Sequence, residues 1–414
     1  MQNKSDKFKV INLPLFFGLS HLGQVFSLCW SKKIGSCYVF DINPKILNSF
    51  KNKRYTLEEP NLKKITSNKI KFLNEFEEIK KFKYIFFTHD TPLNLKNGKP
   101  NLNLIYKNLK KILNLKFKSK TYLIISSQIN PELIISLSKE LNSNKNIKIF
   151  YLVDTLKMGE ALDKFLKPKQ IIIGGEQREK ENILKLFKKF KAQKFYLSLN
   201  DAIITKMAIN IYLSFSVTFA NIIDDLCRQY RSNYFKIINP LKNDDRIGHY
   251  AYIKPSLGFS GGHLERDLFY LEKISKNQLI KRIIKNFLDF NDSRINKINV
   301  KNLLSKKKIV KTLIIGKSYK KNSYSEVNSI FKKLGNKFKL NYFDDIFFKN
   351  KNSKNQLIEL VKKNDLIIYN YSTKINLNRL LILAKKYNKK IVNINDKNIN
   401  VKNNKNLVNF FNSY

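Results

Sequence analysis

Six residues near the N-terminus have the composition of a phosphate-binding turn. The segment Gly18-Leu19-Ser20-His21-Leu22-Gly23 lies between a predicted strand and a predicted helix, and it matches GxGxxG except that Ser20 replaces the middle glycine. Gly18 permits a tight turn, Gly23 permits close packing of helix on strand, and the helix N-terminus offers backbone N–H groups to a pyrophosphate. We expect the serine to weaken dinucleotide binding without abolishing it. The alternative is an ordinary strand–helix turn.

An acidic residue follows at the position where dinucleotide-binding domains recognise a ribose. Asp41 lies 18 residues after Gly23, directly after the predicted strand from Ser36 to Phe40. A carboxylate there accepts hydrogen bonds from a ribose diol and therefore favours NAD over NADP. The alternative is a surface acid at the end of a strand.

A lysine and an asparagine further along the chain share one face of a predicted helix. Lys206 and Asn210 lie in a stretch without Pro or Gly, which predicts one long helix that starts at an Asn200 or Asp201 cap and runs to about Tyr230. Positions i and i+4 share one helix face. Hydride removal from an alcohol requires a proton acceptor and a positive group beside the developing oxyanion. In so lysine-rich a chain, the alternative is a solvated lysine and an ordinary helix-face asparagine.

The apolar runs predict an α/β protein. Short β-branched and aromatic runs alternate with helical segments in both terminal parts of the chain, which is typical of parallel βαβ units with a buried sheet. The predicted strands are Lys9–Phe17, Ser36–Phe40, Tyr84–Thr88, Tyr122–Ser126, Lys148–Val153, Gln170–Ile173, Ile309–Ile315, Asn341–Asp345, Asp365–Tyr369 and Lys390–Asn393.

A second helical region, from about Leu268 to Ile298, follows the long helix. We therefore predict two Rossmann-like parallel-sheet domains joined by a central helical region with a long helix. The boundaries are expected at 1–198, 199–302 and 303–414. The tail from Lys402 onward is rich in Asn and Lys and is expected to fray.

The charge balance is strongly basic, with 79 Lys+Arg against 32 Asp+Glu and a formal net charge of +47 among 414 residues. One reading is attraction to an anionic partner, and the other is the amino-acid usage of an AT-rich coding sequence. Because the lysines are spread along the whole chain, no nucleic-acid partner is expected. The three cysteines, Cys29, Cys37 and Cys227, have no metal-binding spacing, so no metal site is predicted, and a sparse, odd count fits a reducing cytosol.

No secretory or transmembrane segment is expected. The N-terminus has no long apolar run before a cleavage site, and the most apolar stretch, Ala208 to Ile223, is short for a membrane span. That stretch also contains Asn210 and Asn221, so a buried helix is the better interpretation. We expect a cytoplasmic protein without a membrane partner.

Further sequence blocks extend the likeness to dinucleotide enzymes along nearly the whole chain. In their order and spacing they resemble the UDP-glucose/GDP-mannose dehydrogenase family, from about Val10 to Asp396. Each block is weak alone, and the ordered set is specific. The blocks are Glu59-Pro60-Asn61-Leu62, Asp90-Thr91-Pro92, Ser126-Ser127-Gln128, Leu156-Lys157-Met158-Gly159, Thr205-Lys206-Met207-Ala208-Ile209-Asn210, Asp245-Arg246-Ile247-Gly248, Gly258-Phe259-Ser260-Gly261-Gly262-His263-Leu264-Glu265-Arg266-Asp267 and Gly316-Lys317-Ser318-Tyr319-Lys320.

The resemblance implies a function. Such enzymes have an NAD-binding domain, a helical dimerisation region and a C-terminal domain that binds the nucleotide sugar. They oxidise a hexose C6 alcohol to a carboxylate with two NAD. A homodimer, a UDP- or GDP-sugar substrate and a role in polysaccharide biosynthesis are the corresponding expectations.

The resemblance also assigns roles to residues. Lys206 and Asn210 match the pair that holds the substrate oxygen, and Asp267 matches an aspartate that positions a water or proton acceptor, although it could instead cap the following helix. The remaining candidates are cofactor contacts at Gly18, Ser20, Leu22, Gly23, Asp41, Thr91 and Ser127, and substrate contacts at Asp154, Arg246, Gly258, Gly261 and Lys320. Ser127 stands where the family often has a threonine near the reacting water, and Asp154 falls near a glutamate that assists thioester hydrolysis, although the surrounding family pattern is absent.

One departure concerns the nucleophile. The family's Gly-rich loop supplies a cysteine, whereas this chain has His263 there, or Leu264 if the register moves by one residue. Without a thiol no thioester forms, and imidazole can act only as a general base towards an aldehyde hydrate. We expect a two-electron oxidation that ends at a carbonyl. The alternative is a catalytically degenerate pseudoenzyme or structural partner.

Overall fold

The structure is a computed structural model. It describes residues 10–55, 59, 61–65, 68–91, 101–140, 146–156, 160–256, 258–259, 264–296, 310–316, 338–343, 353–369, 375, 377–393 and 407–409. The chain divides into two compact units, one ending at residue 208 and the other beginning at residue 209. The three-domain division expected from the sequence stays a prediction.

The first unit contains an eight-stranded sheet in the order β3-β2-β1-β4-β5-β6-β7-β8. Every neighbouring pair is parallel except β6 and β7, which are antiparallel. Six of the strands follow the 3-2-1-4-5-6 order of the dinucleotide-binding fold, so the predicted Rossmann-like architecture is confirmed. The strands are β1 (Leu15–Phe17), β2 (Cys37–Phe40), β3 (Ile70–Phe72), β4 (Tyr84–Phe87), β5 (Thr121–Ile125), β6 (Ile147–Leu152), β7 (Gln170–Gly174) and β8 (Gln193–Leu197). The short strands β3 and β8 were not predicted.

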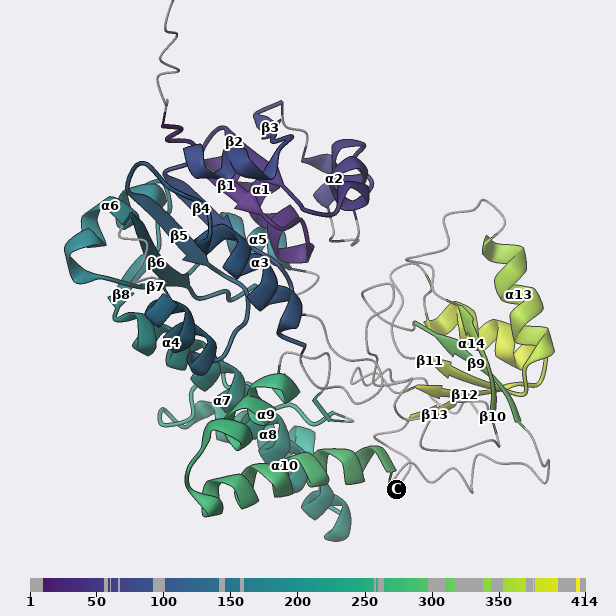
Figure 1. The fold of residues 1–414 in the computed structure, drawn as a ribbon. Coiled ribbons are helices and arrows are strands. Elements are labelled where there is room, and N and C mark those ends of the chain that lie inside the picture. The colour runs from purple at the N-terminus through teal and green to yellow at the C-terminus, as the bar shows by residue number, and fades with distance from the viewer. Residues whose placement is uncertain are drawn as a thin grey trace, which may run out of the picture. The chain divides into compact units, whose positions relative to one another are not determined.

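Helices accompany this sheet, as Figure 1 shows. Strand β1 is much shorter than the apolar run that predicted it, because Ile11 forms only an isolated bridge to Phe82. The helices are α1 (His21–Lys33), α2 (Pro44–Lys51), α3 (Asn103–Leu113), α4 (Pro131–Glu140), α5 (Ala161–Leu166) and α6 (Lys180–Leu184).

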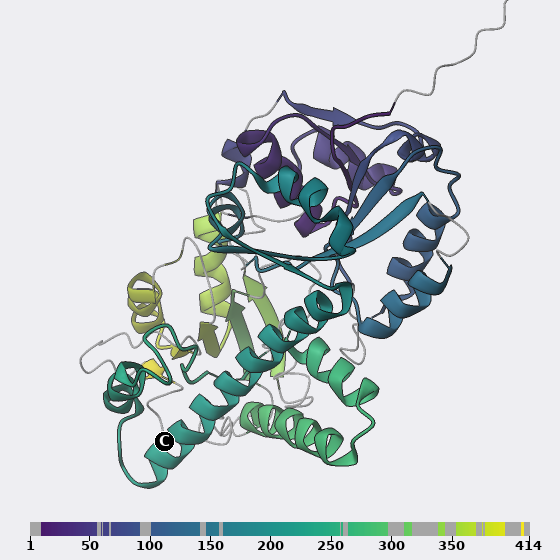
Figure 2. The ribbon, with the colours of Figure 1, turned by 90° about the vertical axis from the view of Figure 1, so that its left-hand side faces the viewer.

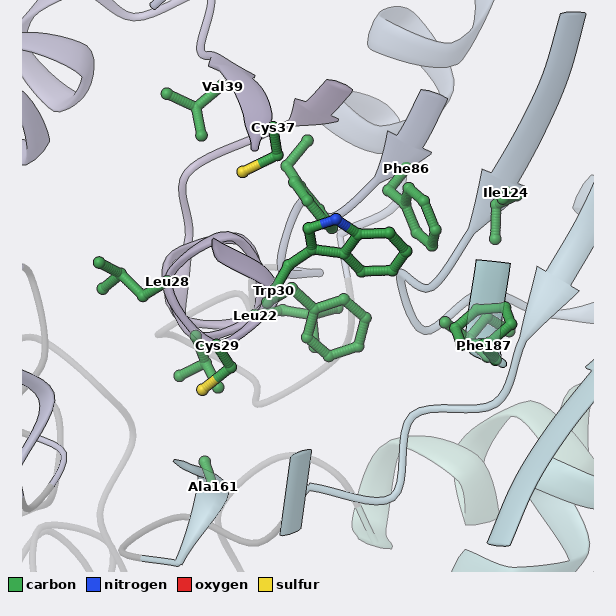
Figure 3. Close-up of a cluster of buried hydrophobic side chains, with 14 of the residues drawn as sticks. Leu22, Leu28, Cys29, Trp30, Cys37, Val39, Phe86, Ile124, Ala161 and Phe187 are labelled. Carbon is green, nitrogen blue, oxygen red and sulfur yellow. The ribbon is translucent and has the colours of Figure 1, made fainter. Parts of the chain in front are cut away.

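Aromatic side chains fill the space between α1 and the central strands (Figure 3). The Trp30 ring packs against Phe16 and Phe86, with ring centroids 5.6 and 5.4 Å apart. Cys29 and Cys37 lie in the same cluster, and burial raises the pKa of both thiols to about 12. Both are therefore unreactive packing residues. Within the described part of the chain, no group of three or more His, Cys, Asp or Glu side chains could hold a metal ion.

The predicted long helix is confirmed as α7 (Leu199–Gln229), the long teal helix of Figure 2. Its expected cap was wrong. Ser198 caps the helix instead, because its hydroxyl accepts a hydrogen bond from the Asp201 backbone N–H at 3.1 Å and donates to the Asp201 carboxylate at 2.6 Å. Asn200 and Asp201 therefore lie inside the first turn.

Helix α7 is long and apolar enough to cross a membrane by length and composition alone. A buried core helix passes the same test. Its buried residues include Lys206, Asn210, Ser214, Asn221 and Asp224, which is a polar set that suits a protein interior.

Among the described residues up to 296, three helices follow α7 in the second unit: α8 (Tyr234–Asn243), α9 (Leu264–Ile274) and α10 (Gln278–Asn296). Helix α8 was not predicted. The helical region expected from about Leu268 to Ile298 contains α9, which begins at Leu264, and α10, which ends at Asn296. Val217 of α7, Leu268 of α9 and Ile284 of α10 share one apolar cluster with Phe259. This cluster packs the segment before α9 against all three helices.

The C-terminal part contains a five-stranded, fully parallel sheet in the order β10-β9-β11-β12-β13. The prediction of a second parallel-sheet block is confirmed. The tail expected to fray contributes β13, which pairs with β12, so that expectation was wrong for Leu407–Asn409, and the rest of the tail lies outside the described residues. The elements are β9 (Val310–Ile315), β10 (Phe338–Phe343), α13 (Ser353–Lys363), β11 (Leu366–Tyr369), α14 (Leu377–Lys386), β12 (Lys390–Asn393) and β13 (Leu407–Asn409).

Candidate active site

The turn between β1 and α1 has the close backbone contacts that its glycines predict. Gly18 has φ +100°, and its N–H donates to the Phe40 carbonyl at 2.9 Å. A Cβ at Gly23 would stand 1.8 Å from the Gly18 carbonyl oxygen, so α1 can approach the turn only because residue 23 has no side chain. Leu22, between them in the first turn of α1, is buried.

Ser20 occupies the middle glycine position without backbone strain. Its φ of −67° is ordinary for any residue, and its hydroxyl donates to the Thr88 carbonyl at 2.7 Å. The side chain therefore points back to the end of β4 and does not cap the N–H groups of α1. The N-terminus of α1 keeps its capacity for a pyrophosphate, so the turn fits a dinucleotide despite the missing glycine.

Asp41 is buried behind this turn. One carboxylate oxygen accepts a hydrogen bond from the Leu19 N–H at 2.7 Å, and the other accepts from the Asn43 N–H at 2.8 Å. These bonds orient the carboxylate. Each oxygen retains a second acceptor site, so a ribose diol can still donate to it.

Two predicted cofactor residues lie where β4 and β5 end. The Thr91 hydroxyl donates to the Gln128 carbonyl at 2.5 Å, and the Ser127 hydroxyl donates to the His89 carbonyl at 2.6 Å. Both hydroxyls thus tie the two strand ends together. Any direct role in binding the cofactor stays a prediction.

Two histidines beside the turn, His21 and His89, were not among the site residues predicted from the sequence. The buried His89 ring stacks edge-on against Phe17 and lies next to Gly18, and burial lowers its pKa. His21, the first residue of α1, pairs with the buried Glu59 carboxylate at 2.9 Å. The Glu59 block in the sequence was the available signal, but its partner could not be read from spacing because 38 residues separate the two.

Lys206 and Asp154 are brought together in the first unit. The buried Lys206 ammonium donates to the Asp154 backbone carbonyl. The Asp154 carboxylate accepts instead from the Leu156 N–H at 2.8 Å, which closes a local turn. Asp154 therefore holds the lysine through its main chain.

Asn210 and Asp267 are brought together in the second unit. The Asn210 side-chain amide donates to the Asp267 carboxylate at 2.7 Å, and Asp267 is 0% exposed. Asp267 is the fourth residue of α9, so the alternative in which it caps that helix is wrong. Lys206 and Asn210 lie one turn apart on α7, as the spacing predicted.

The other residues predicted to contact the substrate are not all described by the structure. Arg246 is exposed, and its guanidinium pairs with Asp244 at 2.6 Å, so its proposed contact with a phosphate or a neighbouring subunit stays a prediction. Gly258 has φ +142° and lies against Asn291. Gly261, His263 and Lys320, together with Gly262, lie outside the described residues.

Comparison with known proteins decides the family. The NAD-binding domain of the UDP-glucose/GDP-mannose dehydrogenase family matches residues 15–191, and the central domain of that family matches residues 200–293. The chain belongs to the UDP-glucose/GDP-mannose dehydrogenase family. It is therefore an NAD-dependent oxidoreductase of the class that acts on CH–OH groups, and the predicted cofactor is confirmed.

Individual relatives resemble the chain over nearly its whole length. A UDP-glucose 6-dehydrogenase of Campylobacter jejuni is 27% identical over 402 residues, covering 92% of this chain and 96% of the relative. A UDP-glucose dehydrogenase of Pyrobaculum islandicum has a TM-score of 0.74 at 17% identity, covering 95% of this chain and 96% of the other. The UDP-D-ManNAc dehydrogenase of Pyrococcus horikoshii has the same TM-score and identity, covering 94% and 97%. The two structures share the fold of this chain.

Proposed function

We propose that this dehydrogenase oxidises a hydroxyl group on the sugar of a UDP- or GDP-sugar and stops after two electrons. The observation that carries the proposal is the fully buried Asp267 carboxylate bonded to Asn210, one helical turn from the buried Lys206. A purely structural helix has no need for this combination of a cation, an amide and a carboxylate, because each costs free energy to bury.

Each of these residues has a distinct task in alcohol oxidation. Bound NAD supplies the hydride acceptor. The Lys206 ammonium stabilises negative charge as it develops on the substrate oxygen, and the Asn210 amide holds that oxygen in place. Asp267 positions the water that takes up the hydroxyl proton. The substrate loses one hydride and one proton, and a carbonyl is left.

The cysteines support a single oxidation step. The chain has three, and Cys29 and Cys37 lie in the NAD-domain core with pKa values raised by burial to about 12. Cys227 is buried near the end of α7. None of the three belongs to the Gly-rich block, where His263 stands in place of the family's cysteine. A thioester has no available thiol, so oxidation beyond the carbonyl is limited to slow reaction of its hydrate with His263 as general base.

Counting NADH tests this proposal. Purified protein is supplied with NAD and a panel of UDP- and GDP-sugars, and NADH formed is divided by sugar consumed. The Campylobacter jejuni relative serves as the comparison enzyme. One NADH per sugar, with a carbonyl product, supports the proposal. Two NADH per sugar would show that the thiol is dispensable. No turnover, together with no NAD binding by calorimetry, would favour the pseudoenzyme.

We also propose that a second copy of this chain covers one face of α7. Large apolar side chains that are between 41% and 71% exposed recur at helical spacing along α7 and at the residue just after it. They are Tyr212, Phe219, Ile222, Leu226 and Tyr230. A solvated surface helix exposes polar side chains, so an exposed apolar stripe of this kind indicates a covered surface. A homodimer that pairs this apolar stripe removes it from water. The cytoplasmic location inferred from the sequence stays a prediction.

A further inference from the structure

We propose that Asn291 and Arg294 of α10, together called the clamp, are positioning residues that hold the main chain at Ser256 and Phe259, and through it Asp267 of α9, for catalysis. The inference rests on the proposed function, because it concerns the placement of Asp267. Neither residue was singled out in the sequence. They lie three positions apart and therefore on the same face of α10.

Asn291 holds the main chain of Phe259 at both of its polar groups. The Phe259 N–H donates to the Asn291 side-chain oxygen at 2.8 Å, and the Asn291 side-chain nitrogen donates to the Phe259 carbonyl at 3.1 Å. A side-chain amide has one acceptor and two donors. Asn291 can therefore make with Phe259 the same pair of hydrogen bonds that a neighbouring β-strand would make. Asn291 is 2% exposed, and water does not compete for these bonds.

Gly258 is the residue that permits this approach. A Cβ at this position would stand 2.5 Å from the Asn291 side-chain oxygen. Its φ of +142° is also one that other residues rarely adopt. The glycine and the asparagine therefore depend on one another, and a side chain at residue 258 would displace the clamp.

Arg294 and Asn221 hold the main chain of Ser256 in the same way. The Arg294 Nε donates to the Ser256 carbonyl at 2.8 Å, and the Ser256 N–H donates to the Asn221 side-chain oxygen at 2.7 Å. The two terminal guanidinium nitrogens donate to α7, at the Asn221 carbonyl and at the carboxylates of Asp224 and Asp225. A planar guanidinium can make these bonds at once, and a lysine cannot.

The described residues on both sides of the glycine-rich stretch are consequently held in place. Ser256 and Phe259 are held by α7 and α10, and Asp267 is held by Asn210 of α7. Phe259 also shares an apolar cluster with Leu268, the neighbour of Asp267 in α9. Loosening the first anchor should change where Asp267 and the substrate sit, and leave the NAD turn untouched because that turn belongs to the other unit.

The test compares Asn291→Ala, Asn291→Gln and Arg294→Lys with Asn286→Ala, an exposed asparagine of the same helix. We expect kcat to fall at least tenfold in Asn291→Ala and Asn291→Gln and about fivefold in Arg294→Lys. The Kd for NAD should stay within twofold of the wild-type value, and Asn286→Ala should be unchanged. Hydrogen exchange of peptides spanning 256–267 should accelerate in the three clamp variants alone.

Circular dichroism gives the folded fraction of each variant, and kcat is corrected for it. A corrected kcat within twofold of wild type in all three variants would overturn the proposal, as would a parallel loss of NAD affinity, which marks general destabilisation. If wild-type protein turns over no sugar, the proposed function fails separately. The clamp is then read from the Kd for UDP-glucose, and an unchanged Kd together with unchanged hydrogen exchange in Asn291→Ala would refute it.

Discussion

Replacing Gly23 by alanine is the most direct perturbation of the cofactor site. The added Cβ would stand 1.8 Å from the Gly18 carbonyl oxygen and 2.8 Å from the Thr88 hydroxyl. Carbon–oxygen contacts in proteins settle at roughly 3.3 Å, so α1 and the turn must separate by about 1.5 Å. The obstructing atom belongs to the backbone, and no rotamer change can relieve the overlap.

Moving α1 away from the turn should lower both the free energy of unfolding and the affinity for NAD. Overpacking of this kind typically costs about 1–3 kcal/mol of folding free energy. The N-terminus of α1 also moves relative to the turn, and a displacement of about 1 Å at a binding site can cost on the order of a hundredfold. We expect the Kd for NAD to rise about 30- to 100-fold, which is about 2–3 kcal/mol.

Isothermal calorimetry with NAD measures this change, and circular dichroism measures the folded fraction. Gly35→Ala is the matched control. Gly35 lies just beyond α1, where a Cβ meets nothing within 4 Å, although its φ of +155° makes alanine mildly strained. The control should lose some stability and keep its NAD affinity. A folded Gly23→Ala protein that binds NAD within twofold of wild type would show that the pyrophosphate does not lie on this turn.

Four further predictions follow from the site and the helices. Asp267→Asn should lower kcat about 10²- to 10⁴-fold with the Kd for NAD unchanged, because a neutral amide no longer orients the water that takes up the hydroxyl proton; an effect under threefold would remove Asp267 from the chemistry. His263→Cys should raise NADH per sugar from one towards two, and a ratio that stays at one would show that a thiol at this position is not sufficient. Iodoacetamide should leave wild-type activity unchanged, because Cys29, Cys37 and Cys227 are all buried and the pKa of the first two is raised to about 12; rapid inactivation would contradict this, with His263→Cys as the sensitive control. Phe219→Asp should shift the protein from dimer to monomer in sedimentation velocity, whereas Asn286→Ala should not, and a wild-type monomer at micromolar concentration would refute the covered stripe on α7.

The sequence by itself determined the elements whose signal is local. Short buried strands read as continuous apolar runs, and a stretch without Pro or Gly read as the long helix α7, because backbone propensity and burial act over a few residues. The same local signals predicted the glycine turn, Asp41 and the one-turn spacing of Lys206 and Asn210. Family resemblance then assigned them a common chemistry.

Only the tertiary structure decided which groups meet. Ser198 rather than its neighbours caps α7, Asp154 meets Lys206 through a carbonyl, and Asp267 lies inside α9 against Asn210. Tail residues 407–409 gain an edge position on a sheet and become a strand because β12 offers unpaired backbone groups. The clamp of Asn291 and Arg294 joins residues 32 to 73 positions apart in the chain. Spacing carries no trace of such contacts, because they depend on how separate helices pack and on which buried polar groups must find partners.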